Sequence, residues 1–355
     1  MMEVTVPLGQ RGYSIIIAPG LLQKLTWRET HCSHELVIIS DQNVADLYLN
    51  NLLKHCEKWH RVVSIVFPAG EQHKNIDTWS GILDTMLKER VSREATILAL
   101  GGGVVGDMAG FVASCYQRGV DFIQIPTTLL AMVDSSVGGK TAINHPLGKN
   151  MIGSFYQPKL VVADLDVLAT LPEREYAAGL AEVLKYGLIR DAELFRTLMR
   201  EVDALQQRRL DILGSIVSEC CRIKAEVVGL DEREQGVRAI LNFGHTFGHA
   251  LEAVTEYRRY LHGEAVAIGM MLALRLSMMM NQLDPGVLAQ TENWLAKMGL
   301  PTVLPEDIDR DALWQAMQSD KKKTHRGLRF ILLNSLGDAV VEETVDFKLV
   351  KEILA

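Results

Sequence analysis

The sequence feature that most constrains the fold is TILAL at residues 96–100, a continuous apolar segment that leads directly into GGGVVGD at residues 101–107. A strand that is apolar on both faces is typical of a parallel sheet covered by helices on both sides. Glycines let the backbone approach a ligand closely, and a helix beginning at about Val105 would present its N-terminus to an anion. The segment favours a dinucleotide site in an α/β domain; the alternative is a turn whose glycines serve only close packing.

The rest of the chain divides into two parts with different sequence patterns. The first half alternates between segments typical of strands and of helices, which are residues 2–7, 12–17, 36–40, 44–59, 62–67, 75–88 and 160–164. After Pro172 the pattern becomes helical, over residues 173–189, 192–207, 211–230 and 263–281, before a strand-like return at 328–334 and a final helix. A chain of 355 residues is also long for a single core. We therefore predict an α/β dinucleotide-binding domain over residues 1–170 and an all-helical domain over residues 171–355.

Composition excludes several classes of protein. The net charge of −7 and a sequence pI near 5.8 disfavour binding of nucleic acid through a general basic surface. No apolar run is long and clean enough to span a bilayer, and the N-terminus alternates like a strand rather than resembling a signal peptide. The five cysteines form no C-x-x-C motif. We expect a cytoplasmic protein with neither nucleic-acid nor membrane partners.

Polar residues follow several of the predicted strands. Asp41 comes after the run at 36–40, and Glu71 and Lys74 follow Phe67 in the sequence PAGEQHK. Thr127 and Thr128 follow Ile125 and Pro126. In an open α/β sheet the carboxyl ends of the strands face the ligand. The alternative, for each of them, is a helix cap or turn residue.

The segment DSSVGGKTAINHPLGKN, residues 134–150, predicts an anion site. It is too rich in glycine for a helix and too interrupted for an ordinary strand, and Lys140 and Lys149 stand beside its glycines. Phosphates and carboxylates need such point charges and close backbone approach. Asp134 and Asn150 lie at its two ends. The alternative is a solvated loop.

A histidine-rich stretch at residues 242–264 offers a second kind of site. His245 and His249 are four apart, so they lie on one face of a helix, and His262 follows a polar interruption at the start of another helix. Two such helices can converge imidazoles on a metal or on a proton-transfer site. This is not the metalloprotease motif H-E-x-x-H, because Thr246 replaces the glutamate. The alternative is a solvated helix face or a capping residue.

Charged residues in the helical half are less specific. Glu182 and Lys185 are three apart in AEVLKYG, and the alanine, leucine and glycine around them indicate that both point inward. Glu182 is then a candidate metal ligand, whereas the alternative is an ordinary surface ion pair. Nothing in their context separates Lys224, Arg238 or the run at 321–323 from surface charge.

Taken together, these motifs resemble the 3-dehydroquinate synthases, which belong to the sugar phosphate cyclases. The resemblance rests on GGGVVGD, IPTTLLAMVDSSVGGKTAIN, GKNMIGSFYQP, LPEREYAAGLAEVLKYG, LNFGHTFGHA, LHGEAVAIGM and SDKK, which occur in that order. It implies an N-terminal NAD-binding domain, a helical domain and an active site in the cleft between them. It also implies a homodimer, in which Arg118 is lent to the neighbouring subunit's site.

The resemblance assigns roles to individual residues. Glu182, His245 and His262 match the metal ligands, for zinc or alternatively cobalt, and His249 matches the proton-transfer residue. Positions that match contacts to the substrate, several of them catalytic, are Asp134, Lys140, Lys149, Asn150, Lys185, Lys224, Arg238, Asn242 and either Lys321 or Lys322. Positions that match the NAD side are Asp41, Glu71, Lys74, Gly102, Gly103, Val104, Asp107, Thr127, Thr128, Lys140, Lys149, Thr170, Leu171 and Glu175.

The implied reaction converts 3-deoxy-D-arabino-heptulosonate 7-phosphate into 3-dehydroquinate and phosphate. NAD oxidises one alcohol transiently, phosphate is eliminated, the ketone is reduced again, and the ring opens and closes by an aldol step. The alternatives are a sister cyclase for another sugar phosphate, a metal-dependent alcohol or glycerol dehydrogenase, and a nucleotide-binding regulatory module. Lys140, Arg238 and Asn242 fit the carboxylated substrate, which disfavours the sister cyclase. The cation-rich pocket disfavours the dehydrogenase, and a regulatory module would leave the sets of histidines and lysines without a role.

Overall fold

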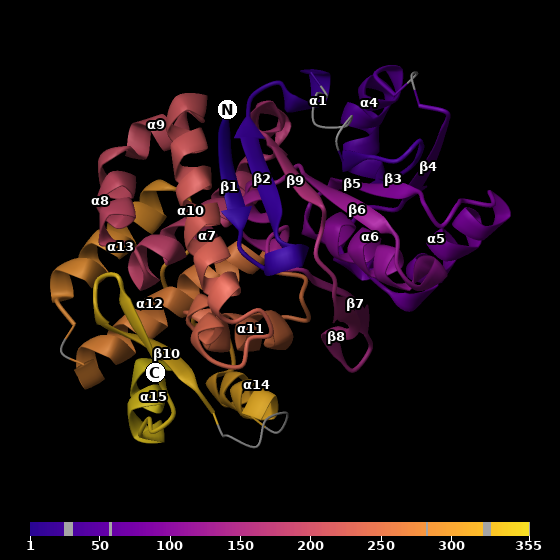
Figure 1. Ribbon diagram of the computed structural model, residues 1–355. Helices are drawn as coiled ribbons and strands as arrows, with labels where there is room; N and C mark the ends of the chain where they lie inside the picture. The colour runs from indigo at the N-terminus through magenta and orange to yellow at the C-terminus, as the bar shows by residue number, and fades with distance from the viewer. Residues whose placement is uncertain (25–30, 57–58, 282, 322–327, 355) are drawn as a thin grey trace. The chain divides into compact units, whose positions relative to one another are not determined.

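The structure is a computed structural model that describes residues 1–24, 31–56, 59–281, 283–321 and 328–354 (Figure 1). The chain forms two compact units, of which the first comprises Met1–Leu171 with Leu213–Arg233, and the second Pro172–Ile212 with Glu234–Ala355. The break after Leu171 lies one residue from the expected boundary. The expectation that all of residues 171–355 belong to the helical domain is wrong for Leu213–Arg233. This segment packs with the first unit, where the Cys221 thiol donates to the carbonyl oxygen of Met132 at 3.3 Å.

The first unit is built on a seven-stranded sheet with the order β1-β2-β9-β6-β5-β3-β4. Only β1 is antiparallel to its neighbour among these pairings. The strands are β1 (Met2–Val6), β2 (Tyr13–Ala18), β3 (Glu35–Asp41), β4 (Arg61–Phe67), β5 (Thr96–Gly101), β6 (Asp121–Pro126) and β9 (Leu160–Asp164). Every residue of β5 and β9 is buried, which accounts for their continuous apolar sequences.

Helices cover this sheet (Figure 1). They are α1 (Leu21–Lys24), α3 (Gln42–Val44), α4 (Asn50–Lys54), α5 (Ile76–Lys88), α6 (Gly103–Cys115) and most of α10 (Leu210–Leu230). A π-helical turn, Ala45–Leu49, joins α3 to α4. Val105, Met108 and Val112 of α6 pack into one core cluster with strand residues such as Ile97 and Ile39. Helix α6 begins at Gly103, slightly earlier than predicted.

The segment at residues 134–150 was predicted to form neither a helix nor an ordinary strand, and this is wrong for its second part. β7 (Lys140–His145) and β8 (Gly148–Phe155) form an antiparallel hairpin. Gly153 makes this pairing possible, because a methyl group at that position would lie 2.0 Å from the carbonyl oxygen of Thr141. Gly138 and Gly139, which precede β7, have φ of 98° and 66°, a conformation that favours glycine. The glycines therefore shape the hairpin instead of preventing it.

The second unit is mainly helical, as expected. Its helices are α7 (Glu173–Ile189), α8 (Ala192–Arg200), α9 (Val202–Gln206), α11 (His245–Val254), α12 (His262–Asn281), α13 (Pro285–Lys297), α14 (Arg310–Lys321) and α15 (Phe347–Leu354). The single helix predicted over residues 192–207 is interrupted at Glu201, which has φ −96° and ψ 25°. The predicted return strand pairs as β10 (Phe330–Ser335) with an unpredicted β11 (Asp338–Glu342).

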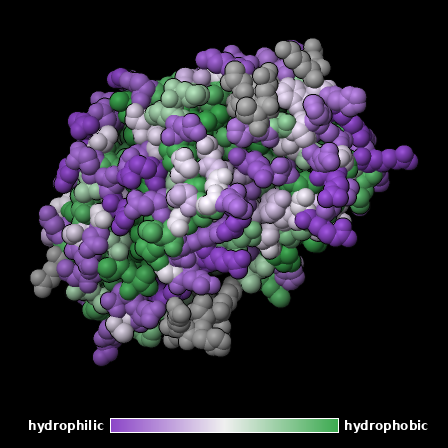
Figure 2. All heavy atoms as spheres, in the orientation of Figure 1, coloured by the Kyte–Doolittle hydropathy of each residue, from purple (hydrophilic) through white to green (hydrophobic). Residues whose placement is uncertain are grey.

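Helix α12 is the central helix of the second unit. It contacts α7, α11, α13, α15 and β10. Within the described residues it is also the one helix long and apolar enough to cross a membrane, but 72% of the relevant window is buried in the protein. Hydrophilic side chains predominate on the face drawn in Figure 2, with apolar ones scattered among them. The apolar sequence of α12 is therefore accounted for by the core of this unit.

Candidate functional site

Glycines bring three helices of the second unit close together. A methyl group at Gly263 of α12 would lie 2.0 Å from the carbonyl oxygen of Ala178 on α7, so only glycine permits this approach. On the other side of α12, a methyl group at Gly269 would lie 2.1 Å from the carbonyl oxygen of Gly244, which precedes α11. Gly244 itself has φ 80°. These glycines let the backbones of the three helices approach one another closely, and the imidazoles converge as a result.

Each of these helices contributes one side chain to a cluster formed by Glu182, His245 and His262. Oε1 of Glu182 on α7 lies 3.6 Å from Nε2 of His245 and 3.7 Å from Nε2 of His262. In a tetrahedral site with ligands at about 2.1 Å, the ligand atoms are about 3.4 Å apart. Each of the two imidazole nitrogens therefore lies from the carboxylate oxygen at about the spacing of two ligands of one cation.

The partner of Nδ1 in each imidazole determines which nitrogen carries the hydrogen and which one offers a lone pair to a metal. Nδ1 of His245 lies 3.1 Å from the carbonyl oxygen of Phe243, and Nδ1 of His262 lies 3.3 Å from Oε2 of Glu252. A carbonyl or carboxylate oxygen can only accept, so both Nδ1 atoms carry the hydrogen. Both Nε2 atoms then direct a lone pair toward Glu182, as metal ligands do.

The Glu182 carboxylate is buried with little compensation. It is 0% exposed, and neither oxygen accepts a hydrogen bond of ordinary geometry from a described residue. Its nearest cation is Lys185, 1% exposed, with which it forms an ion pair one helical turn away. The expected inward orientation of both residues is confirmed. Oε2 pairs with Lys185, and Oε1, which has no hydrogen-bond partner among the described residues, is available to a cation.

The pKa of His245 is well below its ordinary value. Burial is the largest cause, followed by the positive charge of Lys185 and by the neighbouring His262 and His249. His245 is therefore neutral in the metal-free protein at physiological pH. Neutral imidazole is the form that binds a divalent cation.

His249 belongs to the same cluster but differs from its neighbours in exposure. One nitrogen from each of His245, His249 and His262 lies within 4.8 Å of the others. His249 is exposed, whereas His245 is buried. The described residues thus permit two ligand sets, the predicted one with Glu182 and one made of the three histidines. The accessible position of His249 suits a residue that exchanges protons.

Two predicted substrate contacts lie in the same unit. Arg238 is 2% exposed, and Asn242 Nδ2 donates to Oε1 of Glu234 at 2.6 Å. Glu234 was not predicted, and its place in a charged run, DEREQ, gave no sign of this contact.

Burial raises the pKa of Glu175, predicted on the NAD side, while Arg174 opposes this rise. Lys321 ends α14, but its side chain and the whole of Lys322 lie outside the described residues.

In the first unit the glycine turn lies between β5 and α6, as predicted. A methyl group at Gly101 would lie 2.4 Å from Cγ2 of Val105, so the tight turn requires glycine there. Gly102 is the N-cap of α6, and no side chain of the described residues caps this helix. The N–H groups of Gly103 and Val104 at its first turn therefore remain suited to a phosphate.

The polar residues at the strand ends are partly caps. Asp41 Oδ1 accepts from the N–H of Val44 at 3.0 Å, and Thr128 Oγ1 accepts from Ala131 at 3.1 Å. Thr127 differs, because its hydroxyl is buried and has no partner among the described residues. Thr170 is exposed and hydrogen-bonds with Tyr48. The capping alternative thus holds for Asp41 and Thr128, which does not prevent either from contacting a ligand.

Lys74, which is buried, is the centre of a partly exposed polar network in the first unit. Its Nζ lies 2.5 Å from Oδ2 of Asp107 and donates to Oδ1 of Asn150 at 2.6 Å. Asn144 connects the network further, because it donates to Glu71 at 2.8 Å and accepts from the N–H of Asn150 at 2.9 Å. Burial raises the pKa of Asp107, and Lys74 opposes this rise. Sequence reasoning found four of these residues and missed Asn144.

Lys224 and Asp134 form a second pair in this unit. Lys224, on α10, is 5% exposed, and its Nζ lies 2.7 Å from Oδ1 of Asp134 and 2.5 Å from the carbonyl oxygen of that residue. The burial of Lys224 was not predicted, although the apolar residues around it in CCRIKAEVV could have indicated it. Lys140 is exposed at the start of β7, and Lys149 is partly exposed on β8. Arg118 is exposed, with φ 72°.

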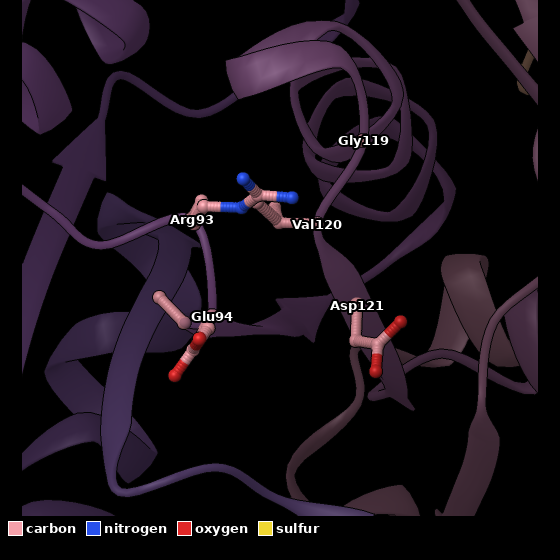
Figure 3. Close-up of a pocket in the computed structure, with 6 residues that line it drawn as sticks. Arg93, Glu94, Gly119, Val120 and Asp121 are labelled. Atoms are coloured by element: carbon pink, nitrogen blue, oxygen red, sulfur yellow. The ribbon is translucent and has the colours of Figure 1, made fainter.

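A separate cavity of about 420 Å³ lies at the opposite end of two strands (Figure 3). Its lining residues are Arg93, Glu94, Ala95, Gly119, Val120 and Asp121. They immediately precede or begin β5 and β6, so they lie at the amino ends of these strands. Ligands of open α/β sheets bind at the carboxyl ends. This cavity is therefore distinct from the candidate site.

Comparison with known proteins agrees with these features. A family described as 3-dehydroquinate synthase N-terminal matches residues 64–178, and one described as 3-dehydroquinate synthase C-terminal matches residues 179–323. The chain is 50% identical over 352 residues to 3-dehydroquinate synthase of Nitrosococcus oceani, which covers 99% of this chain and 98% of that protein.

Two solved structures resemble the chain over nearly its whole length. One is 2-epi-5-epi-valiolone synthase from Streptomyces hygroscopicus with NAD⁺ and Zn²⁺ bound, at a TM-score of 0.90, 29% identity, and coverage of 96% of this chain and 95% of that one. The other is 2-deoxy-scyllo-inosose synthase complexed with carbaglucose-6-phosphate, NAD⁺ and Co²⁺, at a TM-score of 0.89, 27% identity and 99% coverage of both chains.

Proposed function

We propose that this chain, which belongs to the 3-dehydroquinate synthase family, uses NAD as a catalytic cofactor together with one divalent cation. Its reaction converts 3-deoxy-D-arabino-heptulosonate 7-phosphate into 3-dehydroquinate and phosphate. The proposal assigns the cation to Glu182, His245 and His262. The observation that carries it is the convergence of both Nε2 atoms on Oε1 of Glu182, at 3.6 and 3.7 Å. Zinc is the proposed ion and cobalt the alternative, since the related structures contain Zn²⁺ or Co²⁺.

The donor set supports a catalytic rather than a structural cation. One carboxylate and two imidazoles leave coordination positions open for substrate, as in catalytic zinc sites with three protein ligands. When bound, the cation stabilises negative charge developing on oxygen and NAD accepts and returns a hydride. His249, accessible and close to both ligand imidazoles, accepts the proton that leaves the oxidised alcohol, directly or through a water.

The first unit binds the cofactor in this proposal. The pyrophosphate lies at the N-terminus of α6, where Gly102, Gly103 and Val104 offer backbone N–H groups. The remaining residues assigned to this role in the first unit are Asp41, Glu71, Lys74, Asp107, Thr127, Thr128, Lys140, Lys149, Thr170 and Leu171; Glu175, of the second unit, is assigned the same role. Support comes from Asp41, Glu71, Lys74, Asp107, Thr127 and Thr128, which lie at or after the carboxyl ends of β3, β4, β5 and β6, because these ends face ligands in this architecture.

Cations hold the two anionic ends of the substrate. Lys140, Lys149 and Arg238 are the principal candidates, because a phosphate and a carboxylate each need charged donors. Asp134, Asn150, Lys185, Lys224, Asn242 and Lys321 complete the proposed set of substrate contacts. The acidic net charge of −7 does not oppose this, because the cations need only be gathered locally.

We assign the protein to the cytoplasm, supported by its odd number of cysteines, five, which argues against a disulfide framework. We further propose a homodimer in which Arg118 reaches the partner subunit's site. Support comes from the exposed position of Arg118 at the end of the short 3₁₀ turn Tyr116–Arg118.

A turnover assay tests the cofactor roles directly. Purified protein with zinc and substoichiometric NAD should release phosphate from the heptulosonate phosphate over many turnovers, without lasting absorbance of reduced nicotinamide. Stoichiometric NADH would instead indicate an alcohol or glycerol dehydrogenase. Turnover of sedoheptulose 7-phosphate in preference to the heptulosonate would indicate a sister cyclase. Full activity after complete removal of NAD and metal would contradict the proposal.

A further inference from the structure

We propose that Glu252 is a positioning residue, which holds His262 with Nε2 directed at Glu182 and thereby sets the affinity of the metal site. The inference rests on the proposed metal site and adds a residue to it. Glu252 lies seven residues after His245 on α11, so it shares the helix face that carries His245 and His249. Its Oε2 lies 3.3 Å from Nδ1 of His262.

The two proposed imidazole ligands are held in different ways. The His245 side chain is 10% exposed, and its Nδ1 faces the backbone oxygen of Phe243, which no substitution at position 243 would remove. The His262 side chain is 32% exposed, so close packing alone does not fix the orientation of its ring. Its Nδ1 faces a side chain instead. Of the two imidazoles, His262 is therefore the one whose orientation depends on a replaceable residue.

The burial of Glu252 supports the same conclusion. Its side chain is 4% exposed, and burying an ionised carboxylate is costly unless a partner compensates for it. An Nδ1–H···carboxylate hydrogen bond provides such compensation. It also makes Nε2 the free lone pair and increases its basicity, which strengthens its bond to a cation. Removal of such a partner typically weakens metal affinity about 10- to 100-fold.

The first test measures zinc affinity by chelator competition in metal-depleted protein. Glu252→Leu removes the acceptor and the charge, and Glu252→Gln keeps an amide oxygen while removing the charge. We expect affinity to fall about 10- to 100-fold in Glu252→Leu and by a smaller factor in Glu252→Gln. Glu256→Leu, an exposed glutamate just beyond the end of the same helix, is the matched control and should leave affinity unchanged.

The second test needs no metal. In metal-free protein at pH 8, imidazole ¹⁵N shifts should place the hydrogen of His262 on Nδ1, with the resonance assigned by its loss in His262→Ala. In Glu252→Leu, the hydrogen should move to Nε2 in a substantial fraction of molecules. Because an unfolded chain also favours the Nε2–H tautomer, the variant must keep the circular dichroism spectrum of the wild type for this comparison. The Glu252→Gln variant serves if Glu252→Leu does not fold.

The outcomes separate the two proposals. Unchanged zinc affinity in both Glu252 variants, or an Nε2-protonated His262 in the wild type, overturns the role of Glu252. The metal site then still stands if His262→Ala loses zinc. If the wild type binds no zinc, the proposed site itself is wrong, whereas the tautomer of His262 still reports whether Glu252 orients it.

Discussion

Oε1 of Glu182 and Nε2 of His245 lie 3.6 Å apart, although the two residues come from different helices. This separation is too long for a hydrogen bond and close to the spacing of two ligands of one cation. A cation bound between them would satisfy the carboxylate and the imidazole together, as the proposed metal site requires.

The different roles proposed for His245, a metal ligand, and His249, a proton-transfer residue, give the first prediction. His245→Ala should lose most of the bound zinc, because it removes one of three protein ligands. His249→Ala should keep at least half of its zinc and lose about 10²-fold or more in turnover, because it removes only proton transfer. Metal content by atomic emission, paired with steady-state kinetics, measures both. Loss of zinc in His249→Ala would favour the ligand set of three histidines.

Lys224 provides a test of substrate binding. Lys224→Met should lower kcat/KM about 10²-fold, the usual cost of one charged donor in a site, and leave zinc content unchanged. The matched control is Lys159→Met, because Lys159 is 58% exposed and pairs only at the surface with Asp121. Kinetics on the heptulosonate phosphate compare the two variants. A Lys224→Met enzyme within twofold of the wild type would remove this lysine from the site.

The buried Lys74–Asp107 pair gives a prediction for stability and its pH dependence. Lys74→Met leaves the Asp107 charge uncompensated, which should cost about 3 kcal/mol of unfolding free energy at pH 8. Lys159→Met, which breaks an exposed pair, should cost less than about 1 kcal/mol. Urea unfolding followed by tryptophan fluorescence measures both.

The sign of the pH effect follows from the raised pKa of Asp107. Burial raises it in the folded protein, and loss of Lys74 removes an opposing charge. The folded variant then binds a proton more readily than the unfolded chain, so acidification favours folding. We expect the penalty of Lys74→Met to shrink between pH 8 and pH 5. A penalty that is constant or grows in this range would contradict the buried placement of Asp107.

Cysteine reactivity tests the packing of α10. Burial raises the pKa of Cys221 to about 12, so at pH 8 its thiol stays protonated and inaccessible. Iodoacetamide should therefore modify the exposed Cys115 in the native protein and leave Cys221 intact. In urea, both should react. Peptide mass spectrometry distinguishes them, and rapid native alkylation of Cys221 would mean that α10 does not pack as described.

Local sequence determined the parts of the fold that depend on local patterns. The helix predicted over residues 173–189 is α7, Glu173–Ile189, because the small and apolar residues around Glu182 and Lys185 indicated a buried helix. The turn after β5 was also predictable from the sequence, because its glycines follow a strand that is buried throughout.

Features that depend on distant contacts were not predictable in this way. The β7–β8 hairpin depends on the close approach of Gly153 to Thr141. The glycine content of the segment does not by itself indicate this contact. The return of Leu213–Arg233 to the first unit depends on tertiary packing. Glu252 was not singled out from the sequence, although its spacing of seven from His245 could have indicated its position.

Anomalous diffraction at the zinc edge from crystals of the zinc-loaded protein tests the central claim most directly. We predict one strong peak within about 2.3 Å of a Glu182 oxygen and of Nε2 of both His245 and His262, with His249 outside the coordination sphere. A peak coordinated by His245, His249 and His262, with Glu182 unbound, would contradict the assignment, as would zinc bound elsewhere with this cluster empty.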